Sequence, residues 1–165
     1  MPRRITGTLL AATLIACGGG TAPVADRVSE ANVLARVQGW VKAWNTHSAD
    51  SLAPFYAQKD YLTVVWPTGA HTQGWTQESQ QQRTFLPTVT LTNLVTQAPR
   101  ILLMRKDLAL VTFPFTLDLA AGNARQIGPG EGTMLWLNEG GAWRIVAAHF
   151  SYTKAVEAEV TPQRR

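Results

Sequence analysis

Hydrophobic residues change their spacing along this chain, from helical intervals in the first half to strand-like alternation in the second. Between about Asp26 and Thr46 they recur every three or four residues, which predicts one long amphipathic helix. Ser48 offers a cap for a second helix over 49–56, which Pro54 limits to a turn or two. A third helix is expected from Trp75 to Leu86, a segment rich in Gln and followed by a proline.

Strand-like segments lie between the second and third helices and again after the third. Asp60–Trp66 is rich in β-branched and aromatic residues, ends at Pro67-Thr68-Gly69, and is followed by a short return strand through His71. Five further segments, separated by turn residues, predict an antiparallel meander. They cover 88–97, 100–105, 108–119, 125–137 and 142–153. Gly128-Pro129-Gly130 interrupts the fourth of them, which predicts a bulge that bends the sheet.

The last strand segment, Ala142–Tyr152, predicts a pocket. Regular alternation would place on one side Trp143, Ile145, Ala147, His149 and Ser151. Both sides are mostly apolar, as in a strand covered on two faces, but this side ends in the polar groups of His149 and Ser151. Burial of those two groups would be costly unless they had partners, so the polar end of the strand indicates a pocket.

Helices followed by a bent antiparallel sheet are typical of an α+β fold. The apolar face of the long helix must be buried, and the concave side of a curved sheet can bury it. We therefore expect a cone-shaped curved antiparallel sheet wrapped around the long N-terminal helix and two shorter helices, in one domain over 26–154. The tail over 155–165 is polar and is expected to fray.

The N-terminus has the pattern of an export signal. Arg3 and Arg4 precede an uncharged run over 5–16, which is shorter than the roughly 20 residues needed to span a bilayer. The run ends in Leu14-Ile15-Ala16-Cys17, which resembles a bacterial lipobox. In a lipobox the cysteine is acylated and the chain is cut just before it.

These features set the expected location of the mature chain. We expect a lipoprotein signal peptide over 1–16, lipidation at Cys17 and a flexible tether over 17–25. The protein would then be lipid-anchored in the bacterial cell envelope, on the periplasmic or outer-surface side. Cys17 is the only cysteine, so no intramolecular disulfide is available in a compartment that would permit one.

Composition narrows the classes of function. The chain has 165 residues, of which 45% are hydrophobic, and this suits one domain with one core. The net charge of +4 includes Arg3 and Arg4, so removal of the leader lowers it to about +2. Lys and Arg residues are scattered singly or in pairs without a basic stripe, so nucleic acid is not an expected partner.

Four motifs resemble those of a known family. They are Trp40-Val41-Lys42-Ala43-Trp44-Asn45, Trp66-Pro67-Thr68-Gly69, Gly74-Trp75, and Trp143-Arg144-Ile145-Val146 with His149 and Ser151. Together they are similar to a SnoaL-like domain of the nuclear transport factor 2-like superfamily, over roughly 28–153. The resemblance implies the cone fold and suggests a homodimer through the outer sheet face, as is frequent among relatives. It implies no single function, because the superfamily includes ketosteroid isomerases, polyketide cyclases, dehydratases and binding modules without catalysis.

The catalytic positions of those enzymes are mostly occupied by other residues here. The resemblance places the general-base carboxylate of ketosteroid isomerases at Trp66, which cannot accept a proton. The oxyanion-stabilising tyrosine of the same enzymes matches Trp40, whose indole can donate but is not a phenol. Cyclase-like relatives use a pocket His and Asp pair, for which His149 is the candidate and no partner is evident, since Asp118 lies near a strand end.

Two interpretations of His149 stay open. It is the candidate acid-base group, because imidazole titrates near neutral pH and the alternation runs into the expected pocket. The structural alternative is a histidine bonded to a backbone carbonyl or to Ser151. His47 and His71 lie in unrelated segments, so no metal site is predicted, and no cofactor is expected.

Tryptophan is the other unusual feature, with six in the chain. We expect a ligand site with aromatic and polar members, formed by Trp40, Trp44, Tyr56, Trp66, Trp75, Arg83 and Ser151. Among these, Arg83 near the cone mouth could meet an anionic ligand. Each tryptophan could instead fill the space between helix and sheet. Core or dimer-surface positions are expected for Phe113, Phe115, Met134 and Trp136.

Three functions follow from this reading. The first is an envelope lipoprotein whose cone binds a small, largely apolar ligand or acts as an accessory subunit. The alternative is an enzyme of the isomerase, cyclase, dehydratase or hydrolase type with His149 as its acid-base group. The third is a dimer whose cavity is filled by its own tryptophans. What His149 faces distinguishes the enzyme from the other two.

Overall fold

The computed structural model describes residues 24–153 and 157–160, with side chains described from Ser29 to Thr153. The predicted signal peptide, Cys17 and most of the predicted tether lie outside the described residues. The helical elements are α1 (Val24–Trp44), α2 (Ala49–Leu52), the 3-10 turn η1 (Ala53–Phe55), α3 (Trp75–Phe85) and the 3-10 turn η2 (Leu86–Thr88). No helix in the described ranges is both long and apolar enough to cross a membrane.

Eight strands form one sheet in the described part of the chain. They are β1 (Thr63–Val65), β2 (His71–Gln73), β3 (Val89–Thr96), β4 (Arg100–Arg105), β5 (Leu108–Ala121), β6 (Ala124–Glu139), β7 (Ala142–Tyr152) and β8 (Glu157–Val160). The order is β2-β1-β7-β6-β5-β3, while β4 also pairs with β5 and β8 with β6. All pairs are antiparallel except β1 with β7.

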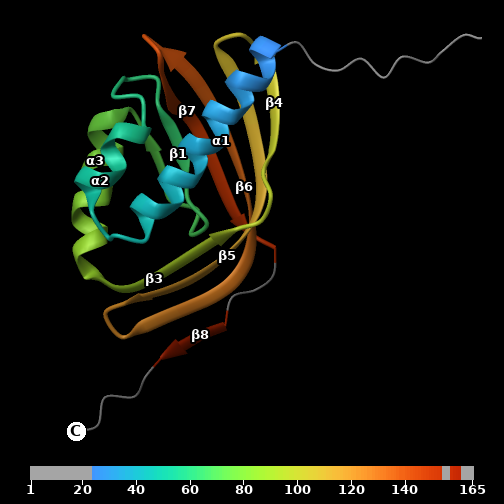
Figure 1. Cartoon of the computed structure of the whole chain (residues 1–165). Helices are drawn as coiled ribbons and strands as arrows, with labels where there is room; N and C mark the ends of the chain where they lie inside the picture. Colours follow the sequence, from blue (N-terminus) through green and yellow to red (C-terminus); the bar gives the residue numbers. More distant parts are fainter. Residues whose placement is uncertain (1–23, 154–156, 161–165) are drawn as a thin grey trace, which may run out of the picture.

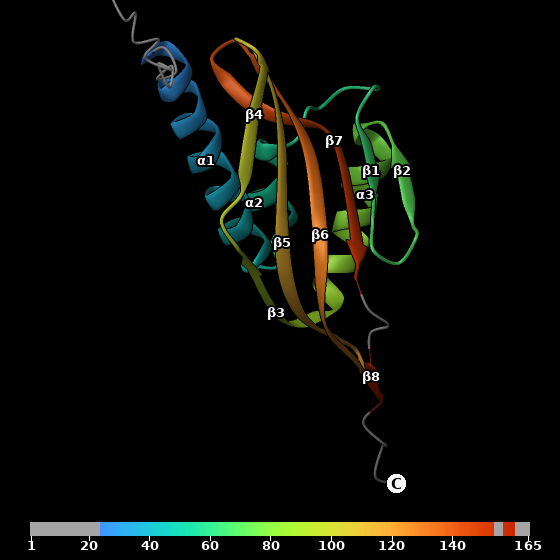
Figure 2. The ribbon, with the colours of Figure 1, turned by 90° about the vertical axis from the view of Figure 1, so that its right-hand side faces the viewer.

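The predicted α+β class is confirmed, with a curved antiparallel sheet and the helices on its concave side. Figure 1 shows α1 lying against the long curved strands, with α2 and α3 grouped on its far side. The view from the side shows β5, β6 and β7 running together along most of the length of the domain (Figure 2). The three long strands therefore form the wall on which the helices pack.

The buried stripe of α1 attaches the helix to this wall. Val33, Val37, Trp40 and Trp44 are buried at four- and three-residue spacing, as expected for one face of a helix. The end of α1 is tied to β3 through Asn45, whose amide accepts from the Leu94 N–H at 2.8 Å and donates to the Leu94 carbonyl at 3.1 Å. This pair of hydrogen bonds fixes where Trp44 meets the sheet.

The predicted cap of the second helix is also present. Ser48 Oγ accepts a hydrogen bond from the Ser51 N–H at 3.2 Å. α2 ends at Leu52 and is followed by η1, which contains Pro54, so the helix is as short as the proline predicted.

The facing of β7 differs from the prediction. Ile145 lies opposite Trp136 and Ala147 opposite Leu135, so β7 carries one extra residue, Val146, at a β-bulge. Before the bulge the odd-numbered residues face the core, and after it the even-numbered residues Ala148 and Phe150 do. The expectation that one face carries Trp143, Ile145, Ala147, His149 and Ser151 is therefore wrong beyond Ile145.

The bulge predicted at Gly128-Pro129-Gly130 is absent. The register of β5 with β6 is continuous from Leu108↔Leu137 to Ala121↔Ala124. The glycines instead occupy buried positions on the concave side, where an added Cβ at Gly130 would lie 2.3 Å from the Phe115 ring and one at Gly132 would lie 2.6 Å from the Phe113 ring. Glycine is needed here because two phenylalanine rings lie directly over the backbone of β6.

The four residues predicted as core or dimer surface are all core. The buried cluster under α1 includes Phe113, Phe115, Met134 and Trp136, each at most 4% exposed. None of the four is available on the outer face of the sheet.

The tail predicted to fray over 155–165 contains β8, which pairs with residues 124–127 of β6. β7 ends at Tyr152, opposite Gly130, so the beginning of β6 has a free edge on that side. An unpaired edge offers backbone donors and acceptors, and β8 uses them.

Candidate ligand pocket

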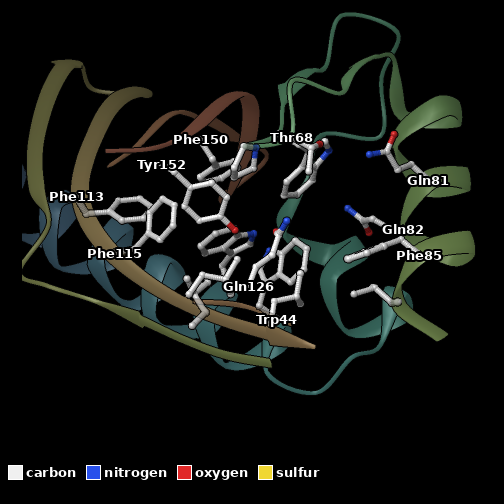
Figure 3. Close-up of a pocket in the computed structure, with 17 residues that line it drawn as sticks. Trp44, Thr68, Gln81, Gln82, Phe85, Phe113, Phe115, Gln126, Phe150 and Tyr152 are labelled. Atoms are coloured by element: carbon white, nitrogen blue, oxygen red, sulfur yellow. The ribbon is translucent and has the colours of Figure 1, made fainter. Parts of the chain in front are cut away.

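A cavity of about 200 Å³ lies between the concave side of the sheet and the helices (Figure 3). Eight of its 17 lining residues are aromatic: Trp40, Trp44, Trp66, Phe85, Phe113, Phe115, Phe150 and Tyr152. The rings support one another, because Trp66 packs on Trp44 at 5.3 Å and on Phe150 at 5.4 Å between centroids, and Trp40 stacks on Phe150 at 5.6 Å. The shape of the cavity is therefore set by a mutually packed set of rings.

Few polar groups face the cavity, and none of the described lining residues is Asp, Glu, His, Lys or Arg. The polar lining side chains are Thr68, Gln81, Gln82, Gln126 and the hydroxyl of Tyr152. Burial raises the pKa of the Tyr152 hydroxyl, which keeps it neutral at ordinary pH. The described wall thus presents neutral groups to anything bound inside.

A buried carboxylate lies directly behind this wall. Glu78 on α3 is fully buried, and its Oε2 accepts from Thr72 Oγ1 at 2.6 Å and from Trp66 Nε1 at 3.3 Å. Its Oε1 accepts from Gln82 Nε2 at 2.7 Å. Burial raises the pKa of Glu78, and the hydrogen bonds from Thr72, Gln82 and Trp66 oppose the shift without cancelling it. Two residues of the cavity wall, Trp66 and Gln82, are oriented by this one carboxylate.

Tyr56 supports the wall from a second position behind it. Trp40 Nε1 donates to the Tyr56 hydroxyl at 3.0 Å, so the indole donor is already used. Burial raises the pKa of Tyr56 well above its ordinary value, the charge of Glu78 raises it further, and the indoles of Trp40 and Trp44 oppose the shift. The Trp44 N–H lies outside hydrogen-bond geometry. Tyr56 is therefore a neutral phenol that positions Trp40.

The structure brings three of the predicted ligand residues to the cavity and leaves the others elsewhere. Trp40, Trp44 and Trp66 line it. Trp75 is half-buried and stacks at 6.3 Å on Tyr56, so both stand behind the lining residues.

Arg83 lies away from the cavity. Its guanidinium is exposed and forms an ion pair with Asp50 at 2.9 Å, joining α3 to α2 on the surface. Its surface position is at odds with the anion-binding role expected at the mouth.

His149 and Ser151 lie on the other face of β7 because of the bulge at Val146. His149 is exposed and stands opposite Thr133 in the sheet, and neither His149 nor Ser151 lines the cavity. The described residues contain no cluster of three or more His, Cys, Asp or Glu side chains that could hold a metal ion.

Sequence reasoning missed the two polar residues that organise the wall. Trp75, Glu78, Gln82 and Phe85 follow one another at spacings of three, four and three, which is one face of a helix. The aromatic residues at the ends of this stripe were the signal that the polar residues between them also face the core.

The sequence profile of the SnoaL-like domain matches residues 33–155. The chain belongs to the SnoaL-like family. The match spans α1 from Val33 onward, the later helices, β1 to β7 and every lining residue of the cavity, so the pocket is a feature of the SnoaL-like domain itself. The family resemblance expected from the sequence motifs is confirmed.

Solved structures with the same fold differ widely in sequence. A nuclear transport factor 2-like superfamily protein from Salmonella enterica superposes with a TM-score of 0.70 at 18% identity, covering 79% of this chain and 94% of that one. A protein from Novosphingobium aromaticivorans described as a candidate scytalone dehydratase gives 0.71 at 11% identity, with coverages of 85% and 92%. A hexachlorocyclohexane dehydrochlorinase gives 0.68 at 12%, with coverages of 86% and 96%.

These identities establish the shared fold and no shared activity. No curated protein sequence matches the chain significantly.

Proposed function

We propose that this SnoaL-like domain binds a small, largely apolar molecule in the aromatic cavity. The observation that carries the proposal is a formed cavity whose described wall is rich in aromatic and leucine side chains and contains no charged side chain. Ligand sites in proteins are typically concave and apolar with a few polar groups that fix orientation, and this cavity has that character.

Proton transfer is the second candidate, and Glu78 is the residue that supports it. Its raised pKa is a property of catalytic acids and bases, and two structural neighbours are named after elimination reactions. A catalytic group must reach the reacting atoms, however, and Glu78 is separated from the cavity by Trp66 and Gln82. Binding is therefore the better supported function.

A panel of small apolar molecules tests binding through the thermal midpoint of the purified domain. Binding to the folded state raises the midpoint in a concentration-dependent way. The matched variants are Leu117→Trp, which adds an indole on the cavity side of β5, and Leu110→Trp, which adds the same group to the other side of that strand. We expect Leu117→Trp to abolish the response and Leu110→Trp to keep it. A binder that stabilises Leu117→Trp as well as the wild type would show that the cavity is not the site.

We also propose that the chain is exported and anchored by lipid at Cys17. Support comes from Arg3, Arg4, the apolar run after them and the lipobox-like Leu14-Ile15-Ala16-Cys17. Two acyl chains anchor a protein stably where one gives only marginal binding. Cys17→Ala should therefore move the protein from the membrane fraction to the soluble fraction of its bacterial host. Retention of Cys17→Ala in membranes after a high-salt wash would contradict lipid anchoring.

A further inference from the structure

One acceptor in the cavity wall has no hydrogen-bond donor. The Gln82 side chain is buried and lines the cavity, and its Oε1 has no partner among the described residues. Figure 3 shows its amide turned from α3 toward the space enclosed by the rings. A buried carbonyl oxygen without a donor is costly, so this atom is a place where a ligand donor would be favoured.

The orientation of the Gln82 amide is set by Glu78. The Gln82 Nε2 donates to Glu78 Oε1 at 2.7 Å, while the other carboxylate oxygen accepts from Thr72 and Trp66. A flipped amide would place its carbonyl oxygen against the carboxylate, where two acceptors repel each other. The donating side of the amide is thus committed to Glu78, and the carbonyl oxygen is left without a donor.

The size of the cavity limits the ligand. An apolar cavity of about 150 Å³ holds one benzene molecule. At about 200 Å³ this cavity has room for one ring with one or two small substituents. Its aromatic walls favour a flat or compact ring, and the absence of charged side chains among its described lining residues favours a neutral one.

We propose that the cavity binds a neutral single-ring molecule bearing a hydroxyl group, a phenol or a cyclic alcohol, whose O–H donates to Gln82 Oε1. This inference rests on the proposed binding function and names its ligand class. Gln82 is the specificity residue. Glu78 is a positioning residue, because it acts on the ligand only through the amide it orients.

Three single-ring probes distinguish the contribution of the hydroxyl group to affinity from that of the ring. They are p-cresol, 4-methylanisole and toluene. In calorimetric titrations of the wild-type chain, we expect p-cresol to bind about 3- to 10-fold more tightly than 4-methylanisole, as one net hydrogen bond provides. 2-Naphthol, which carries the same hydroxyl on two fused rings, should bind more weakly than p-cresol because the cavity is too small for it.

Two variants assign the preference to the amide. Gln82→Met keeps an unbranched side chain and removes the acceptor, so its affinities for p-cresol and 4-methylanisole should become equal. Glu78→Gln removes the charge that orients the amide, so it should reduce the same preference. If either residue acted only on stability, its variant would bind toluene, p-cresol and 4-methylanisole more weakly by similar factors and would keep the preference for p-cresol.

The outcomes are distinct. Equal affinity for p-cresol and 4-methylanisole in the wild type, or a preference that survives in Gln82→Met, overturns the hydroxyl assignment. Tighter binding of 2-naphthol than of p-cresol overturns the single-ring assignment. If all four probes fail while other apolar molecules bind in a way that Leu117→Trp abolishes, the ligand class is wrong and the binding function stands. If nothing binds, the binding function itself fails.

Discussion

The two halves of the concave face are formed by the same three strands, β5, β6 and β7, yet one half is filled and the other holds the cavity. Along β6 the inward positions of the filled half carry Met134 and Trp136, both fully buried. In the other half the inward positions are Gly128, Gly130 and Gly132. The cavity lies over these glycines, where β6 contributes only Gln126 to the wall, and the other lining residues come from neighbouring strands, helices and turns.

The comparison shows that aromatic content alone does not make a cavity. Trp136 and Trp44 are both buried tryptophans, but Trp136 is enclosed on all sides and Trp44 borders empty space. The difference lies in β6: its glycines let the rings of Phe113 and Phe115 approach the backbone closely, and β6 places no large side chain in the space beside them.

Truncation of one tryptophan in each half gives the largest expected effect. Trp136→Ala should lower the free energy of unfolding by about 3 to 5 kcal/mol, because a cavity opens in a packed region. Trp44→Ala should cost less, since one side of this ring already borders a cavity. Chemical denaturation of both variants measures the difference. A larger loss for Trp44→Ala would mean that the two halves are not packed as the comparison requires.

Adding a methyl group to β6 tests the role of the glycines with a smaller effect. In Gly130→Ala the new Cβ would meet the Phe115 ring at 2.3 Å and the Ser151 carbonyl oxygen at 2.5 Å, and backbone cannot move aside easily. We expect destabilisation of about 1 to 3 kcal/mol, as for other overpacked sites.

Gly132→Ala is the matched case, because its nearest atoms all belong to the Phe113 ring. The ring can shift into the cavity, so this variant should lose less stability than Gly130→Ala but bind ring-sized probes more weakly. Thermal melting and titration with toluene check the two expectations separately. Equal stability of the two variants would show that the Ser151 backbone does not limit the space at Gly130.

The smallest expected effect is a pH dependence. Burial raises the pKa of Glu78 above the ordinary glutamate value of about 4.3. At pH values between the pKa of Glu78 in the unfolded chain and its higher pKa in the folded chain, the folded state binds more protons than the unfolded state. The free energy of unfolding therefore falls as pH rises through this window. Glu78→Gln lacks this loss, and its stability relative to the wild type should therefore increase with pH.

Denaturation of both proteins at several pH values from about 4 to about 8 measures this trend. Glu131→Gln, which neutralises an exposed carboxylate on the outer face of β6, is the control and should parallel the wild type. If the curves of Glu78→Gln and the wild type run parallel as well, the buried carboxylate is not protonated more readily in the folded chain.

Much of the fold could be predicted because its signals are local. Helical spacing identified α1, and turn residues such as Gly140 and Gly141, both with positive φ, separated β6 from β7. Trp40, Trp44 and Trp66 were expected at a ligand site because they belong to the half of the chain that should line the cone.

The site was harder to predict where a single residue reverses the pattern. Arg144-Ile145-Val146-Ala147-Ala148 has no alternation of polar and apolar residues around the bulge, so nothing local shows that β7 changes face at Val146. The sequence therefore predicted that His149 faces inward, whereas the structure shows it exposed. Glu78 was missed for a different reason. A carboxylate is rarely fully buried unless partners satisfy it, and two of its three partners, Trp66 and Thr72, lie outside its own helix.

The single parallel pairing in the sheet has a consequence for the order of folding. β1 joins β7 through Thr63↔Ala147 to Val65↔His149, so the segments that carry Trp66 and Glu78 are attached to the last long strand of the domain. Closing so long a loop carries an entropic cost, and contacts between distant parts of a chain form slowly. The β5-β6-β7 hairpins can form from neighbouring segments, whereas the cavity comes into existence only when β7 captures β1. A nascent chain therefore has no binding site until nearly all of the domain has been synthesised.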